Sequence, residues 1–228
     1  MKGKLVKVFV FMMFLCEFAN SQSNTESITF NPTFADKQIN LADSSFYLRD
    51  SSNFQIEVLK FYISKLQLLK NGKVVFTEKH GAFLIDISKP LSCKINIAKY
   101  IDFDAIQFNL GIDSTINVSG AMGGDLDPTK GMYWTWQSGY INFKLEGKNN
   151  LCKTRNHEFQ FHLGGYVSPF NSLQTVKLPV KNKSKVVIDL DVKKIIENID
   201  FKKQHSIMST TSDAVCFSAL VAKAFSIN

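Results

Sequence analysis

The sequence contains none of the short motifs that mark the common catalytic sites. It has no G-x-S-x-G, no H-E-x-x-H, no phosphate-binding G-x-x-x-x-G-K-[ST] and no G-x-G-x-x-G. Only four histidines occur in the 228 residues. Asp189 and Asp191 share one face of a predicted strand, which we interpret as an ordinary exposed edge and not as an acid-base pair. We therefore expect a protein that is not an enzyme.

Paired cysteines and basic stripes are also missing. No C-x-x-C occurs, so the sequence offers no support for a thioredoxin-like or structural zinc site. The net charge of +7 comes from scattered residues, without the basic stripe and interleaved aromatics of a nucleic-acid-binding surface. Outside the N-terminal segment the cysteines are Cys93, Cys152 and Cys216. One pair could close in an oxidising compartment, but their spacing decides neither the pairing nor its existence.

Long apolar runs are confined to the N-terminus. Lysines precede an apolar run at residues 5–15, and Ala19 and Ser21 occupy the small-residue positions before a cleavage site at Gln22. The run is shorter than the ~20 residues that span a bilayer. We therefore predict a signal peptide at 1–21, a single exported domain at 22–228, and no transmembrane segment. Lipid attachment at Cys16 is the disfavoured alternative, because bulky side chains precede it.

Most of the remaining chain alternates between strand patterns and turn residues. Asn71-Gly72 lies between two apolar-rich runs and predicts a type I′ hairpin. Apolar residues that recur at every second position predict further strands at 105–113, 140–147, 157–165 and 185–192. The second and third of these are expected to pair as antiparallel neighbours. Residues 114–131, rich in Gly, Asp, Asn and Ser, are predicted to form a loop.

The alternation assigns side chains to faces. Phe143, Leu145, Phe159 and Phe161 are expected to share one core. The polar positions between them are expected to point outward: Asn142, Lys144, Glu146, Glu158, Gln160 and His162.

Two helices are predicted near the C-terminus. Residues 192–201 have the spacing of a short helix, and residues 212–225 form a better candidate that Ser212 or Asp213 can cap. The apolar stripe of the second helix is predicted to comprise Val215, Ala219, Ala222 and Phe225. The fold class is therefore mainly β, an antiparallel β-sandwich with one or two short helices near the C-terminus.

Both tryptophans of the chain lie in one aromatic block, M-Y-W-T-W, which begins at Met132. On a strand that starts there, Trp134 and Trp136 project to the same face. They then either fill the sandwich core or line a binding site. The polar residues 137–139 interrupt the pattern and predict a bulge beside that site.

Aspartates precede this block. Asp127-Pro128 predicts a turn in which Asp127 accepts from the backbone and Gly131 closes the loop. The alternative is a calcium site that uses Asp125, Asp127 and oxygens near Asp113. We favour the turn.

His162 is the histidine best placed to act as a ligand. It precedes Gly164-Gly165, where the backbone of another segment can approach closely, and lies one strand away from the tryptophans. His157 falls on the opposite face and is expected to pack or to lie at a rim. We expect His162 and at least one tryptophan to line one solvent-reachable pocket.

A family resemblance follows from these residues. The run G-D-L-D-P-x-x-G-M-Y-W-T-W-Q-S-G-Y-I, followed by F-K-L-E-G and F-x-F-H-L-G-G, resembles the MbnP-like copper-binding domain family of methanobactin-associated periplasmic proteins. The likeness extends from about Ile28 onward and is specific in two blocks, 113–147 and 159–165.

The resemblance implies copper binding outside the cytoplasm, with His162 as an imidazole ligand. It also implies Trp134 or Trp136 as the position that a partner dihaem enzyme oxidises to kynurenine in some members. Copper-binding members have an Asn-His pair ahead of M-x-W-x-W, whereas this chain has Asn117-Val118, so the histidine is absent.

Substitute ligands for the absent histidine are Met132, Met208 and His205, since thioether and imidazole suit copper. We expect Met132 or Met208 at the edge of the pocket. The function that follows is an exported, non-catalytic copper-binding protein for metal acquisition or delivery. The alternative is a metal-free binding module of the same fold, whose aromatic cleft recognises a protein or an organic ligand.

Overall fold

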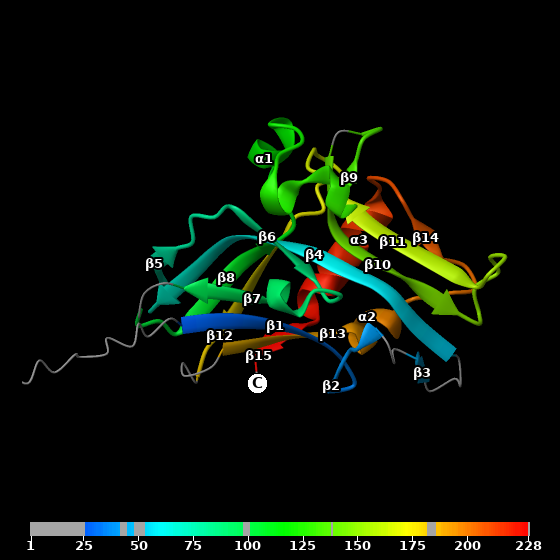
Figure 1. Ribbon diagram of the computed structural model, residues 1–228, viewed down its shortest axis with the longest axis horizontal. Helices are drawn as coiled ribbons and strands as arrows, with labels where there is room; N and C mark the ends of the chain where they lie inside the picture. Colours follow the sequence, from blue (N-terminus) through cyan, green and yellow to red (C-terminus); the bar gives the residue numbers. More distant parts are fainter. Residues whose placement is uncertain are drawn as a thin grey trace, which may run out of the picture.

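The computed structural model describes residues 26–41, 45–47, 53–97, 101–137, 139–181 and 186–227. The predicted signal peptide lies outside these ranges. Within them the chain forms two β-sheets that pack face to face, together with three α-helices (Figure 1). The predicted mainly β sandwich is confirmed. No helix in the described ranges is long and apolar enough to cross a membrane.

The smaller sheet has β1 at its centre. Its order is β15-β13-β1-β2, and β7 also pairs with β1. The β1–β13 pairing is parallel, from Ile28↔Val186 to Thr33↔Asp191, so the sandwich is not purely antiparallel. The strands are β1 (Glu26–Phe34), β2 (Lys37–Gln38), β7 (Lys94–Ile97), β13 (Val186–Asp191) and β15 (Phe225–Ile227).

The larger sheet has the order β12-β8-β4-β10-β11-β14, and β3, β5, β6 and β9 extend it along β4 and β10. β10 and β11 pair antiparallel as predicted, whereas β11 and β14 pair in parallel. The strands are β3 (Ser45–Tyr47), β4 (Asn53–Lys70), β5 (Lys73–Thr77), β6 (Ala82–Asp86), β8 (Ala105–Leu110), β9 (Tyr133–Trp134), β10 (Gly139–Asn149), β11 (Glu158–Gly164), β12 (Gln174–Pro179) and β14 (Ser206–Ile207).

The predicted hairpin at Asn71-Gly72 joins β4 to β5. Lys70 pairs with Lys73 across the two-residue turn. Asn71 and Gly72 have φ values of 49° and 77°, which is the left-handed backbone that a type I′ turn requires at both central positions. This prediction is confirmed.

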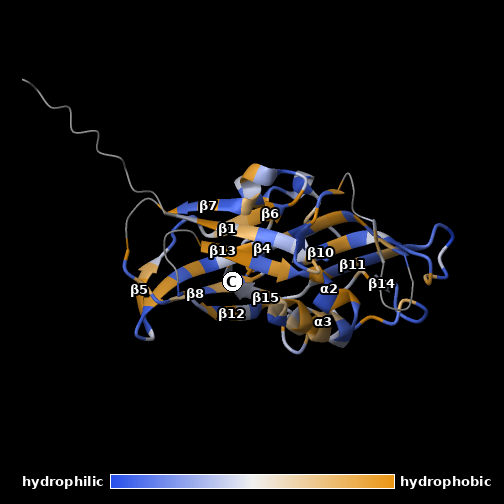
Figure 2. Ribbon diagram, turned by 90° about the horizontal axis from the view of Figure 1, so that it is seen from below, coloured by the Kyte–Doolittle hydropathy of each residue, from blue (hydrophilic) through white to orange (hydrophobic). Residues whose placement is uncertain are grey.

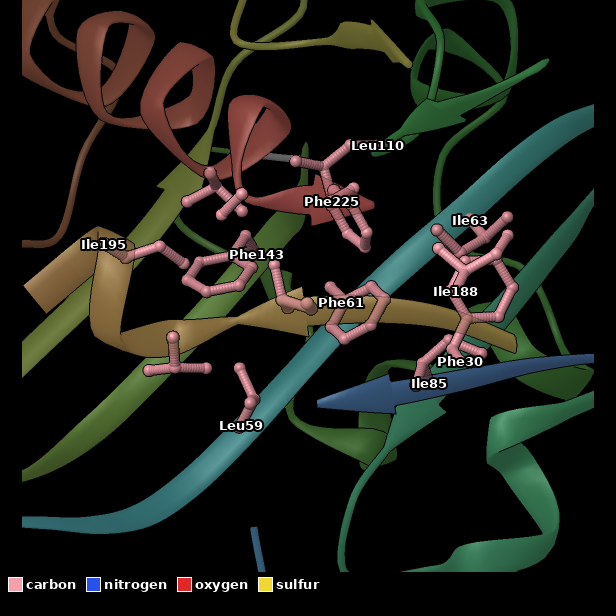
Figure 3. Close-up of a cluster of buried hydrophobic side chains, with 14 of the residues drawn as sticks. Phe30, Leu59, Phe61, Ile63, Ile85, Leu110, Phe143, Ile188, Ile195 and Phe225 are labelled. Carbon is pink, nitrogen blue, oxygen red and sulfur yellow. The ribbon is translucent and has the colours of Figure 1, made fainter. Parts of the chain in front are cut away.

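The sandwich core, defined as the buried apolar cluster between the two sheets, contains the side chains whose alternation predicted it. Phe143, Leu145, Phe159 and Phe161 are all at most 1% exposed and belong to this one cluster. Figure 3 shows Phe61 and Phe143 of the larger sheet facing side chains from the smaller sheet and from α2 (Val192–Ile196). Figure 2 shows the matching alternation of hydrophilic and hydrophobic residues along the strands.

Helix α3 (Ser212–Lys223) covers the core beside β11 and β12. Its N-cap is Thr211, whose hydroxyl accepts from the backbone N–H of Ala214, so the predicted caps Ser212 and Asp213 are wrong by one or two residues. The predicted stripe is also wrong, because the helix turns its one large ring, Phe217, into the core. The buried helix positions are Ala214, Phe217, Ser218 and Val221.

Residues 114–131 are not the continuous loop that was predicted. Helix α1 (Ser114–Val118) begins there because the Asp113 carboxylate accepts from the backbone N–H of Ile116. Two short 3₁₀ turns follow at Gly124–Leu126 and Pro128–Lys130. At short range these polar residues provide helix caps as readily as loop turns.

A second apolar cluster lies on the other face of the larger sheet. We call it the cap cluster, because the segment that carries α1 and β9 covers it at the top of Figure 1. It contains Tyr62, Ala82, Leu84, Ile112, Leu126, Met132, Trp134, Tyr140 and Ile141. The larger sheet is therefore packed on both faces, and the cap cluster forms the base of the candidate site.

Candidate functional site

The two tryptophans lie at the hairpin between β9 and β10, but in different environments. β9 ends at Trp134, which pairs with Gly139, and Trp136 lies in the connecting turn. Trp134 is 5% exposed in the cap cluster, whereas Trp136 is 65% exposed. The prediction that both project from one strand face is wrong, because the strand stops before Trp136. The turn still brings the two rings together, with centroids 5.7 Å apart at 43°.

The bulge predicted at residues 137–139 lies further along β10. Gln137 belongs to the turn and Gly139 begins β10, and the register with β11 shifts instead between Ile141 and Phe143. Asn142 is consequently turned inward and is 1% exposed, contrary to its predicted outward position. Its amide accepts from the backbone N–H of Ile112 and donates to Ser172, each at 2.9 Å.

Trp134 packs directly against the end of β11. A Cβ on Gly164 would lie 2.6 Å from Cζ3 of the indole ring, so the ring occupies the space that a side chain would need. His162 precedes Gly164 by two residues on the same strand and therefore shares its face. His162 and Trp134 thus lie on one side of the sheet. The close backbone approach predicted at these glycines is confirmed.

His162 itself is buried and held by a carboxylate. It is 6% exposed, and its Nε2 lies 2.6 Å from Oε1 of Glu146. Lys144 Nζ reaches the same oxygen at 3.2 Å. The hydrogen bond from His162 is the main cause that lowers the pKa of Glu146, against the opposing effect of burial. An ionised carboxylate only accepts hydrogen bonds, so Nε2 of His162 is the donor, and the tautomer that can bind a metal is the one whose lone pair lies on Nδ1.

The substitute ligands are divided between two places. Met132 is fully buried in the cap cluster. β14 pairs in parallel with β11 at Phe161↔Ile207, and Met208 is the first residue after the end of β14. Met208 is 40% exposed. His205 lies on the same segment, and its Nδ1 is buried without a hydrogen-bond partner in the described chain.

A pocket of about 300 Å³ opens between the β9–β10 turn and the residues that follow β11. Its walls include Trp134, Gln137, Tyr166, Phe170 and Thr210. His162, Met132 and Met208 do not line this pocket, so a pocket shared by His162 and a tryptophan stays a prediction.

The register of the sheet explains why His162 is not part of this pocket. Glu146 pairs with Gln160, on the side of His162 away from Gly164. Glu146 therefore binds His162 from a register position away from Gly164.

Asn117 is the part of the expected Asn-His pair that this chain retains. It is 3% exposed, and its amide donates to the backbone oxygens of Ile112 and Asp113 and accepts from the backbone N–H of Tyr140, each at 2.9 Å. It therefore fastens α1 to β10. Val118, at the position expected for the histidine, is 75% exposed.

The carboxylates near the site have structural partners. Asp127 accepts from the backbone N–H of Thr129 at 2.8 Å, and Gly131 closes the turn with φ of 74°, so the turn interpretation is confirmed. Asp125 binds Lys130 at 2.7 Å and the backbone N–H of Leu84. No group of three or more His, Cys, Asp or Glu that could hold a metal is found in the part of the chain that the structure describes.

Asp189 and Asp191 do not lie on an exposed edge, because β13 runs between β1 and β15. Asp189 accepts from the Asn31 amide at 2.7 Å, and Asp191 caps α2. Both carboxylates therefore have structural contacts.

The described cysteines are all free thiols: Cys93, Cys152 and Cys216. Burial raises the pKa of Cys152 to about 11. His157 is exposed in the turn before β11, and its Nδ1 lies 2.9 Å from the backbone oxygen of Cys152.

The family model for MbnP matches residues 23–210, which is most of the chain. The chain belongs to the MbnP family. A solved structure, MbnP from Methylosinus trichosporium, is similar in fold, with a TM-score of 0.61 and 11% sequence identity. The similarity covers 78% of this chain and 79% of that one. No curated protein matches the chain in sequence.

Sequence reasoning missed Glu146 as the partner of His162, although its place on the outward face of the neighbouring strand was a usable indication. It also missed Tyr166, Phe170 and Thr210. Thr210 belongs to no sequence pattern; it lines the pocket and binds Gln137, which is 73 residues away in the chain.

Proposed function

We propose that this MbnP-family protein is an exported, non-catalytic protein that binds one Cu(I) ion at His162, for metal acquisition or delivery. The hydrogen bond between His162 and Glu146 is the observation that carries the proposal. Histidines that bind metals commonly donate their other ring N–H to a carboxylate, which fixes the tautomer and makes the ligand more basic. Here that arrangement leaves Nδ1 of His162 as the ligating atom.

The other ligand atoms available near His162 determine which oxidation state of copper the site prefers. Met208 directly follows Ile207, the register partner of Phe161, and a soft thioether with an imidazole suits Cu(I) better than Cu(II). A second imidazole is missing at Val118, so we expect weak binding. Export is supported by the N-terminal sequence pattern.

The dihaem partner implied by the family would need to reach an indole ring. We propose Trp136 as the position that it oxidises, because Trp136 is 65% exposed and Trp134 is enclosed at 5%. Peptide mass mapping across residues 131–144 of protein from the native host checks this, and oxidation at Trp134 alone would contradict it.

The test is competitive Cu(I) titration of the wild type, His162→Ala and Val118→His. We expect one Cu(I) per wild-type chain, loss of this ion in His162→Ala, and at least tenfold tighter binding in Val118→His, since the added imidazole restores the family's pair. His157→Ala is the matched control, because that histidine is exposed in a turn before β11.

Two outcomes would overturn the proposal. One is a wild-type protein that binds no Cu(I). The other is a His162→Ala variant that is folded, as judged by its circular dichroism spectrum, and binds Cu(I) as the wild type does.

A further inference from the structure

Lys144 connects the His162 site to the segment that carries the tryptophans. It pairs with His162 across β10 and β11, so the two side chains leave the sheet on the same face. Its ammonium reaches Oε1 of Glu146 at 3.2 Å and donates to the backbone oxygen of Gly131 at 3.3 Å. One cation therefore contacts both the carboxylate that binds His162 and the turn that leads into Met132.

The ammonium and the imidazole share one carboxylate oxygen. Nε2 of His162 lies 2.6 Å from Oε1 of Glu146, the same atom that Lys144 reaches. Both contacts of the ammonium are at or beyond the long end of the usual range of roughly 2.7–3.2 Å, as expected of a cation divided between two acceptors. Because a nearby cation neutralises part of the charge on this oxygen, Lys144 weakens the hydrogen bond that Glu146 accepts from His162.

The neighbouring lysine of the sheet has a different carboxylate partner. Lys60 pairs with Lys144 across β4 and β10, and it donates to the backbone oxygen of Lys130 at 3.3 Å. Its carboxylate partner is Asp86 at 3.1 Å. The two lysines thus hold consecutive carbonyl groups of the turn, and of the two it is Lys144 that also contacts the His162 site.

The Gly131 carbonyl belongs to the peptide bond that leads into the β9–β10 hairpin. The next backbone oxygen, that of Met132, accepts from the N–H of Ile141 at 3.0 Å. Trp134, at the end of β9, packs on Gly164 of β11. The contact between Lys144 and Gly131 therefore fastens the start of a hairpin whose end is packed on the strand of the candidate ligand.

We propose that Lys144 regulates the copper site of the proposed function, on which this inference rests. It is a positioning residue that weakens Cu(I) binding at His162 and holds the β9–β10 hairpin. When Nδ1 carries Cu(I), the imidazole gains positive charge, and its Nε2–H becomes a stronger donor to Glu146 and repels the ammonium. Lys144 then moves onto the Gly131 carbonyl, so copper binding tightens the hairpin.

The first measurement is made without metal. Lys144→Leu removes the ammonium and adds no metal-binding atom, whereas Lys144→Arg keeps the charge. We expect the ¹H signal of the His162 Nε2–H to move downfield in Lys144→Leu, because its bond to Glu146 strengthens, and to stay near the wild-type position in Lys144→Arg. Hydrogen exchange of the Ile141 amide should accelerate about threefold in Lys144→Leu, the effect of losing one weak polar contact.

Cu(I) titration tests the regulation itself. Lys144→Leu should bind Cu(I) about threefold more tightly than the wild type, whereas the loss of a merely structural side chain would weaken binding. Cu(I) should slow exchange of the Ile141 amide in the wild type and leave it unchanged in Lys144→Leu. Lys148→Leu is the matched control, because Lys148 lies on the same strand and pairs with Glu57 at 3.0 Å. We expect it to bind as the wild type does.

A folded Lys144→Leu protein with an unmoved His162 signal, or with Cu(I) affinity equal to or below that of the wild type, would overturn the regulation alone. A wild-type protein that binds no Cu(I) would overturn the proposed function and the regulation together. Circular dichroism checks the fold, and Lys144→Gln carries the same expectations if the leucine variant does not fold.

Discussion

Phe61 and Tyr62 are consecutive residues of β4, and both are fully buried, yet they lie in different kinds of interior. Phe61 points into the sandwich core and contacts Phe30, Phe143 and Phe225 through ring centroids 5.8–6.3 Å apart. Tyr62 points to the opposite face and into the cap cluster. There it meets Tyr140 edge to face and donates its hydroxyl to the backbone oxygen of Asp125 at 3.0 Å.

The two faces are therefore held by different forces. The sandwich core is stabilised by the burial of apolar side chains, many of them aromatic, between strands with long pairings. The cap cluster is smaller, and its covering segment is fastened by single polar side chains such as Asn117 and Asn142. Burial raises the pKa of Tyr62 above its ordinary value, which is consistent with a hydroxyl enclosed in this cluster. We infer that the core maintains the fold, whereas the cap can loosen locally near the two candidate sites.

The largest difference is expected from substitutions at the two neighbouring positions of β4. Phe61→Ala should lower the free energy of unfolding by about 3–5 kcal/mol, because it empties a fully buried ring position. Tyr62→Phe should lower it by only about 1 kcal/mol, since one hydrogen bond is lost and the ring remains. Urea denaturation measures both values. Equal losses at the two positions would refute the distinction between the faces.

An intermediate effect is expected at Asn117. Asn117→Ala removes two hydrogen bonds to the backbone oxygens of Ile112 and Asp113 and the one that joins α1 to Tyr140 of β10, and we expect a loss of about 2 kcal/mol. Hydrogen exchange should accelerate at residues 112–118 and at Tyr140 while the β1–β13 pairing stays protected.

Asn198→Ala is the control for Asn117→Ala. Asn198 also donates its amide to a backbone oxygen, that of Lys194 at 2.7 Å, but in an exposed position. Uniform acceleration across both sheets in Asn117→Ala would show that the cap is not a separate unit.

The sandwich core was predictable because one rule governs it. In a regular strand every second side chain faces the same way, so Phe159 and Phe161 could be assigned inward from the sequence alone. The same rule failed at Asn142, because the register shift in β10 adds a residue that periodicity cannot reveal. It also failed to place Trp136, which lies beyond the end of β9.

The candidate sites were less predictable, because contacts between distant segments create them. His162 and the Trp134 block were found from residue types and from a family resemblance. The contact between Gln137 and Thr210, and the packing of Trp134 on Gly164, depend on how loops meet at the end of the sheet. No local pattern in the sequence encodes these contacts.

The smallest effect on stability is expected at Glu146, the residue of β10 whose carboxylate binds His162. The hydrogen bond from His162 is the largest cause that holds the pKa of Glu146 below its ordinary value of 4.5, with Lys144 adding to it and burial opposing it. A lowered pKa in the folded state means that the ionised carboxylate stabilises the fold above pH 4.5. This contribution is lost as the pH falls from 4.5 through the lower folded value.

Glu146→Gln should therefore be less stable than the wild type above pH 4.5, and the difference should shrink as the pH is lowered below that value. Urea denaturation between pH 3 and pH 6 measures it. Glu57→Gln is the control, because Glu57 pairs with Lys148 in a more exposed position, with 39% of its side chain accessible. A difference that stays constant or grows in acid would contradict the assignment. Because Glu146 also fixes the Nε2–H tautomer of His162, ¹⁵N spectra of Glu146→Gln should show the other tautomer gaining population. An unchanged tautomer would mean that Glu146 stabilises His162 without presenting Nδ1 to a metal.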